Sequence, residues 1–149
     1  QQVMGVFHPD LVGIQARVLQ RLGSRRVMIV HGLEGLDEIS LSAPTMVGEL
    51  RDDRIREYTI SPEDFGLKHA DPAAVRVSSV DESKAMMLAA LENVDGPQRD
   101  IVALNAGASI YVAGLADTLA AGVDKARSVI ASGAARRKVE EFVACTRDV

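Results

Sequence analysis

Apolar residues in the first third of the chain alternate between strand-length runs and helical spacing. Residues 3–7 and 26–31 are near-continuous apolar runs, which are typical of strands covered on both faces of a parallel sheet. Between the runs, Pro9 suits the first turn of a helix and Gly23 suits its left-handed end. The apolar positions of this helix recur every three or four residues, at Leu11, Ile14, Val18 and Leu22. The pattern predicts a strand–helix–strand unit with a right-handed crossover.

The pattern changes after a loop that extends to Pro44. Residues 45–50 and 55–60 alternate partly between apolar and polar positions, and a charged link of four residues joins them. This arrangement predicts an antiparallel β-hairpin. Residues 61–66 resemble a single helical turn ended by Gly66, and residues 67–79 lack a period, so we expect extended coil there.

The remaining residues have helical periodicity. We expect helices over residues 81–93, 98–115 and 118–132, and a last helix after Gly133 with Val139, Phe142 and Val143 on its apolar face. The helix over 98–115 is rich in alanine and glycine, and a narrow apolar stripe on it favours close helix packing: Ile101, Leu104, Ala108 and Val112. The predicted fold class is α/β: a mixed, mostly parallel sheet with a βαβ start, a β-hairpin and C-terminal helices packed on it.

Composition and charge narrow the classes of function. The chain has 149 residues, and only 3% of them are aromatic, so the core must be aliphatic. A net charge of −4 argues against a nucleic-acid partner. No apolar run approaches the roughly 20 residues that span a bilayer, so we expect no membrane segment. The lone Cys145 has no partner for an internal disulfide and fits a reducing cytoplasm.

An acidic pair follows the second predicted strand. Asp37 and Glu38 come shortly after that strand, in a segment where Gly32 and Gly35 permit sharp turns. Ligand crevices of open α/β sheets lie outside the carboxyl ends of the strands. Mg²⁺ takes carboxylate oxygens and completes its shell with water and substrate phosphates. The pair is therefore either a magnesium site for a diphosphate substrate or an ordinary pair of surface carboxylates.

Other polar residues carry weaker signals. His31 at the strand end is either a base or, as we favour, a hydrogen-bonded structural residue. Asn105 is explained by packing, although it could donate to a neighbouring loop. There is no glycine-rich phosphate loop and no Cys/His cluster of metal-binding spacing. We identify no catalytic and no cofactor-binding residue beyond the metal candidates.

Several segments together resemble the anthranilate phosphoribosyltransferases. The acidic-pair segment, residues 30–40, is similar to that of the family, and further segments that look like family segments follow in family order: residues 5–9, 55–58, 62–67, 104–106, 111–114 and 132–134. The resemblance covers nearly the whole chain. It implies part of a nucleoside phosphorylase/phosphoribosyltransferase-like α/β domain.

The resemblance also implies a function. The family transfers a phosphoribosyl group from phosphoribosyl diphosphate to the amine of anthranilate, in tryptophan biosynthesis. Asp37 and Glu38 would bind Mg²⁺ directly or through water. The resemblance further implies a homodimer in the full-length enzyme, which pairs through an N-terminal helical domain.

The chain departs from the family in length. The N-terminal helical domain and the diphosphate-binding loops have no counterpart in residues 1–149, so we expect a C-terminal part of the α/β domain that is inactive alone and exposes apolar surface along residues 3–7. Two alternatives stay open: a non-catalytic binding relative of the same fold, and an enzyme like the pyrimidine nucleoside phosphorylases.

Overall fold

The computed structural model describes residues 1–147, which form one four-stranded sheet and five helices. In chain order the elements are β1 (Gln2–Gly5), α1 (Asp10–Arg21), β2 (Arg26–Gly32), β3 (Thr45–Arg51), β4 (Arg54–Ile60), 3₁₀ turns at Pro62–Phe65 and Pro72–Val75, α2 (Val80–Leu91), α3 (Pro97–Val112), α4 (Leu119–Ala131) and α5 (Ala134–Arg147). The predicted α/β class is confirmed. The turn at Pro72–Val75 lies where we predicted coil, and the Asp71 side chain stabilises it by accepting a hydrogen bond from the Ala73 amide.

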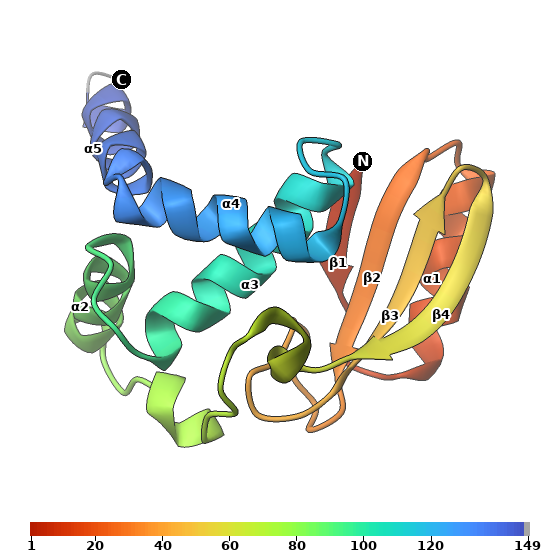
Figure 1. Cartoon of the computed structure of the whole chain (residues 1–149), viewed down its shortest axis with the longest axis horizontal. Coiled ribbons are helices and arrows are strands. Elements are labelled where there is room, and N and C mark those ends of the chain that lie inside the picture. Colours follow the sequence, from red (N-terminus) through yellow and green to blue (C-terminus); the bar gives the residue numbers. More distant parts are fainter. Residues whose placement is uncertain (148–149) are drawn as a thin grey trace.

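The sheet has the strand order β1-β2-β3-β4 (Figure 1). β1 pairs with β2 in parallel, which confirms the predicted strand–helix–strand start, and β3 and β4 form the predicted hairpin. β2 and β3 are also antiparallel, with Gly32 opposite Thr45. The sheet is therefore mixed as predicted, but parallel pairs do not predominate among these four strands, because the loop after β2 returns the chain directly alongside it.

Helix α1 covers one face of the sheet with a different stripe from the one predicted. Val12 and Ala16 are buried, whereas Ile14, Val18 and Leu22 are between 42% and 75% exposed. The reason is a close approach between helix and strand: a β-carbon on Gly48 of β3 would lie 2.9 Å from both the carbonyl oxygen and the Cγ1 of Val12. Leu11 and Leu19 pack beside Val12 and Ala16 in the cluster under the helix. The other predicted stripe positions face outward.

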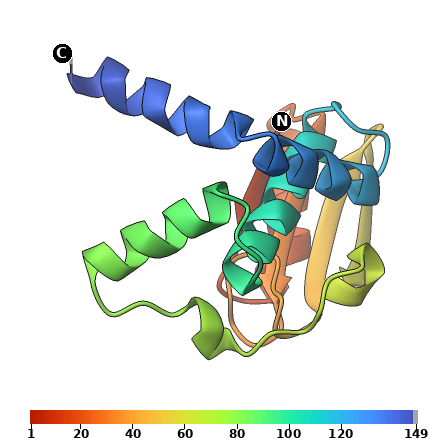
Figure 2. The ribbon, with the colours of Figure 1, turned by 60° about the vertical axis from the view of Figure 1, so that its left-hand side comes forward.

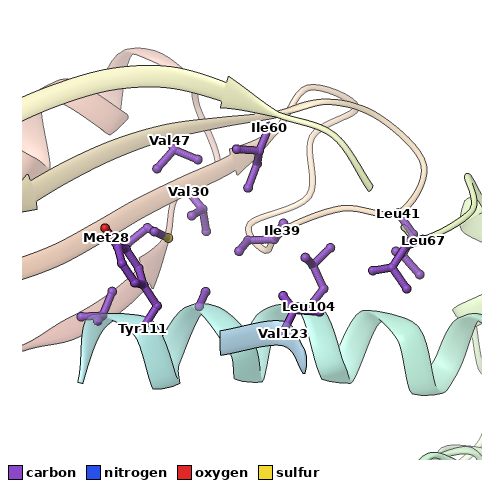
Figure 3. Packing of buried hydrophobic residues seen from close by; sticks show 12 residues of the cluster. Met28, Val30, Ile39, Leu41, Val47, Ile60, Leu67, Leu104, Tyr111 and Val123 are labelled. Atoms are coloured by element: carbon purple, nitrogen blue, oxygen red, sulfur yellow. The ribbon is translucent and has the colours of Figure 1, made fainter. Parts of the chain in front are cut away.

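Helix α3 covers the other face of the sheet and closes the main core. Met28, Val30 and Val47 of the sheet pack with Leu104 and other residues of α3 in one buried cluster. Ile39 and Leu41 of the loop after β2 belong to the same cluster. Figure 3 shows Ile39 between the strand ends and the helix, and Leu41 beside Leu67. The stripe predicted on α3 is thus confirmed, and the loop that carries the acidic pair is anchored in the core.

The other C-terminal helices are not stacked directly on the sheet, contrary to our expectation. α4 crosses α3 at a point where a β-carbon on Gly122 would overlap the carbonyl oxygen of Gly107. This crossing confirms the predicted close packing, and it leads α5 away from the strands, while α2 packs against α3 and α5 (Figures 1 and 2). Phe142 of α5 is consequently 67% exposed.

The segment expected to expose apolar surface does so only in part, and the expectation of no membrane segment can also be compared with the structure. In the segment expected to expose apolar surface, Phe7 is 78% exposed, but Val6 is buried because its side chain packs in the cluster between the sheet and α1. Among residues 1–147, no helix is both long enough and apolar enough to cross a membrane.

Candidate metal centre

The loop between β2 and β3 leaves the carboxyl end of β2 and lies beside the end of β1. Gly32 donates its amide to Leu36 O at 2.8 Å, and Gly35 donates its amide to Gly32 O at 2.8 Å. Gly35 has a φ of 106°, which favours glycine over other residues. The two glycines therefore make the sharp turn predicted from the sequence, and the turn presents the acidic pair at the carboxyl edge of the parallel strands.

Asp37 and Glu38 are both exposed on this loop. Among residues 1–147, no lysine, arginine or histidine forms an ion pair with either carboxylate. Partial burial raises the pKa of Glu38 above its ordinary value, and the neighbouring charge of Asp37 raises it further. In the described part of the chain the two negative charges thus have no ion-pair partner, and a cation bound beside them would relieve their repulsion.

The residue after the pair is held by α3. Asn105 accepts a hydrogen bond from the Ile39 amide at 2.9 Å and donates its own amide to Ile39 O at 2.9 Å. The expectation that Asn105 could donate to a neighbouring loop is confirmed. Because the Ile39 side chain is 1% exposed in the main core, Asn105 and the core together fix the backbone directly after Glu38.

A cluster of hydroxyl groups, from Ser40, Ser42 and Thr45, stabilises the same loop. No sequence motif predicted this cluster. Ser40 Oγ and Ser42 Oγ both donate to the carboxylate of Glu34, and the Ser40 amide donates to Thr45 Oγ1 at 3.0 Å. Burial alone would raise the pKa of Glu34, but the hydrogen bonds from Ser40 and Ser42 outweigh it and hold the pKa of this carboxyl below its ordinary value. The serines near the acidic pair thus serve the loop structure.

The lowered pKa of Glu34 predicts a pH-dependent contribution to stability. The ionised form stabilises the fold fully above the unfolded-state value of 4.5, and this contribution is lost as the pH falls through the folded-state pKa. Glu34→Gln should lower the free energy of unfolding at about pH 7 by less than about 1 kcal/mol, because the group is exposed. Urea unfolding of both proteins should show the difference shrinking below about pH 4.5; a difference that grows there would contradict this prediction.

His31 takes the structural role that we favoured. It is buried, and its Nδ1 lies 2.8 Å from Val6 O. Because a carbonyl oxygen can only accept, the proton is assigned to Nδ1. This hydrogen bond ties the end of β2 to the segment after β1, next to the acidic loop.

The acidic pair fits one kind of metal site. Within residues 1–147 there is no group of three or more His, Cys, Asp or Glu side chains that could hold an ion. A protein cage of the kind that calcium or structural zinc prefers is therefore not formed by these residues. Two carboxylates on an exposed loop suit Mg²⁺, which keeps several waters and shares its remaining positions with substrate phosphates.

Comparison with known proteins defines the protein family of this chain. The family described as "Glycosyl transferase family, a/b domain" matches residues 1–136. The chain belongs to this glycosyl transferase family.

Its relatives point to one kind of transferase. Anthranilate phosphoribosyltransferases of Aromatoleum aromaticum and Xanthomonas axonopodis pv. citri are 57% and 56% identical, over 97% and 99% of this chain. The crystal structure of the enzyme from Thermus thermophilus superposes with a TM-score of 0.87 at 40% identity, over 96% of this chain. The resemblance predicted from the sequence is confirmed. The chain spans 42–43% of the length of these relatives.

A more distant structure shares the fold. Anthranilate phosphoribosyltransferase from Saccharomyces cerevisiae, in complex with PRPP and Mg, has a TM-score of 0.85 at 22% identity and matches 99% of this chain. PRPP here is phosphoribosyl diphosphate. This likeness establishes the fold of the domain, and the assignment of Asp37 and Glu38 to a metal stays a prediction.

Proposed function

We propose that this chain supplies the metal-binding part of an anthranilate phosphoribosyltransferase. The complete enzyme would transfer phosphoribosyl from PRPP to the amine of anthranilate, in tryptophan biosynthesis. The observation that carries the proposal is the position of Asp37 and Glu38 at the carboxyl edge of β1 and β2, exposed and without an ion-pair partner among residues 1–147. The names of the relatives support the choice of substrates.

The reaction defines what this part of the enzyme must do. The bond from ribose C1 to the diphosphate oxygen breaks, a bond from C1 to the anthranilate nitrogen forms, and the amine loses a proton. Mg²⁺ held by Asp37 and Glu38 would neutralise charge that develops on the departing diphosphate. The residues of this chain would hold the two carboxylates at fixed positions, so that PRPP is oriented when it binds.

We further propose that the activity needs more than this chain. The diphosphate-binding loops and an N-terminal helical domain, through which the complete enzyme would form a homodimer, would come from the remainder of the protein. We place the enzyme in the cytoplasm, in keeping with the free Cys145, and assign it no nucleic-acid partner, in keeping with the net charge of −4.

Loss of anthranilate fluorescence in the presence of PRPP and Mg²⁺ tests this proposal. We expect turnover by the complete protein and by a mixture of this chain with the missing N-terminal half, and no turnover by this chain alone. Activity of the chain alone would contradict the proposed division of the site. A complete protein that leaves anthranilate unchanged, or that cleaves pyrimidine nucleosides with phosphate, would contradict the proposed reaction.

A further inference from the structure

The backbone of the acidic pair is contacted by two elements that lie far from it in the sequence. Gly5, the last residue of β1, lies against Asp37. Asn105, in the middle of α3, forms hydrogen bonds to the backbone N–H and C=O of Ile39. The three-residue stretch that contains both carboxylates is therefore held at its two ends. Neither contact involves a carboxylate oxygen, so both leave the acidic side chains free to bind a ligand.

The contact with Gly5 requires a residue without a side chain. A β-carbon built on Gly5 would overlap the carbonyl carbon and oxygen of Asp37 and would lie 3.2 Å from its Cα. Gly5 is not among the glycines with a positive φ, so its backbone conformation alone would allow alanine. What excludes alanine is the backbone of Asp37, which cannot move aside as a flexible side chain could. Substitution must displace either the end of β1 or the acidic loop.

The contact with Asn105 uses both polar atoms of its amide. The oxygen accepts from the Ile39 amide, and the nitrogen donates to Ile39 O and also to Ile101 O at 3.1 Å. The bond to Ile101 lies one helical turn back and fixes the orientation of the Asn105 side chain on α3. Ile39 is almost completely buried, so removal of the amide would leave its backbone polar groups without these partners.

We propose that Gly5 and Asn105 are positioning residues for the metal centre. They would set where Asp37 and Glu38 stand relative to the carboxyl edge of the sheet, while themselves touching neither ion nor substrate. This inference rests on the proposed function. Loss of a group that orients metal ligands typically costs about 10-fold to 100-fold in metal affinity or activity. A shift of about 1 Å in a reacting geometry has a comparable effect.

The test compares two variants with two matched controls in the complete enzyme. Gly5→Ala and Asn105→Ala should each weaken Mn²⁺ affinity, measured with PRPP present by water-proton relaxation, and lower kcat, both by about 10-fold to 100-fold. Gly48→Ala introduces a milder clash on the α1 face, where the new β-carbon would lie 2.9 Å from the carbonyl oxygen and from the Cγ1 of Val12. Ser109→Ala alters an exposed residue one turn from Asn105 on the same helix. Both controls should keep Mn²⁺ affinity and kcat within about twofold of the parent, even if Gly48→Ala lowers Tm.

The outcomes separate this inference from the proposed function. Asp37→Asn with Glu38→Gln serves as the reference: if it leaves Mn²⁺ affinity and turnover unchanged, the proposed metal site is wrong and the positioning role falls with it. If the reference loses both but Gly5→Ala and Asn105→Ala behave like their controls, only the positioning role is overturned. Should Gly5→Ala fail to fold, Asn105→Ala measured well below its Tm decides the question.

Discussion

Replacing Asp37 by Asn and Glu38 by Gln together should lower the turnover of the complete enzyme by about 100-fold to 1,000-fold, the usual cost of losing charge stabilisation in a transition state. The two substitutions remove both charges while they keep the shape of the side chains. The fold should be retained, because both residues are exposed and form no ion pair among residues 1–147. Initial rates at saturating PRPP and Mg²⁺ measure the effect.

The chain contains a matched control for this experiment. Asp52 and Asp53 are a second adjacent acidic pair, also exposed, in the turn between β3 and β4 at the opposite end of the sheet. Both have positive φ, which asparagine tolerates. Asp52 pairs with Arg51, and Asp53 accepts from Gln20, only at the exposed surface, so Asp52→Asn with Asp53→Asn should fold normally. It should leave turnover unchanged. Equal losses in the two double variants would show that overall charge matters and that the loop has no special role.

Truncation of Leu104 should produce the largest loss of stability that we predict. Leu104 is 0% exposed and packs in the cluster that joins α3 to the sheet and to Ile39 of the acidic loop. Leu104→Ala should lower the free energy of unfolding by about 2–5 kcal/mol, since it removes buried methyl groups and leaves a cavity. Denaturant unfolding followed by circular dichroism measures the loss.

Val102 provides the comparison on the same helix. It is 39% exposed, so Val102→Ala should change the free energy of unfolding by no more than about 0.5 kcal/mol. A small effect of Leu104→Ala, close to that of Val102→Ala, would contradict the assignment of Leu104 to the core.

The sequence predicted the elements well where the spacing of apolar residues agrees with the residues that begin or end an element. The apolar run before His31, the charged link between β3 and β4, and the stripe on α3 each led to the observed element. The predicted buried stripe on α1 was wrong at Ile14, Val18 and Leu22. Apolar spacing cannot show how closely a helix approaches a sheet. Gly48 permits that close approach, and its partner Val12 lies 36 positions away in the chain.

The candidate site, too, could be predicted only in part from the sequence. The acidic pair and its two glycines were visible as a local pattern after a buried strand. The contacts that hold the pair were not visible, because Gly5 and Asn105 lie 32 and 68 positions from Asp37. Each of them reads locally as an ordinary strand end or helix position. Only the parallel pairing of β1 with β2 and the packing of α3 against the loop bring them together.

Anomalous diffraction from a crystal of the complete enzyme with PRPP and Mn²⁺ would test the central claim most directly. Mn²⁺ binds the same oxygen ligands as Mg²⁺ and can be located without ambiguity. The account predicts a Mn²⁺ peak bonded to a carboxylate oxygen of Asp37 or Glu38, or to a water that one of them holds, and shared with PRPP. Mn²⁺ bound to PRPP with both carboxylates turned away, and with no bridging water, would contradict it.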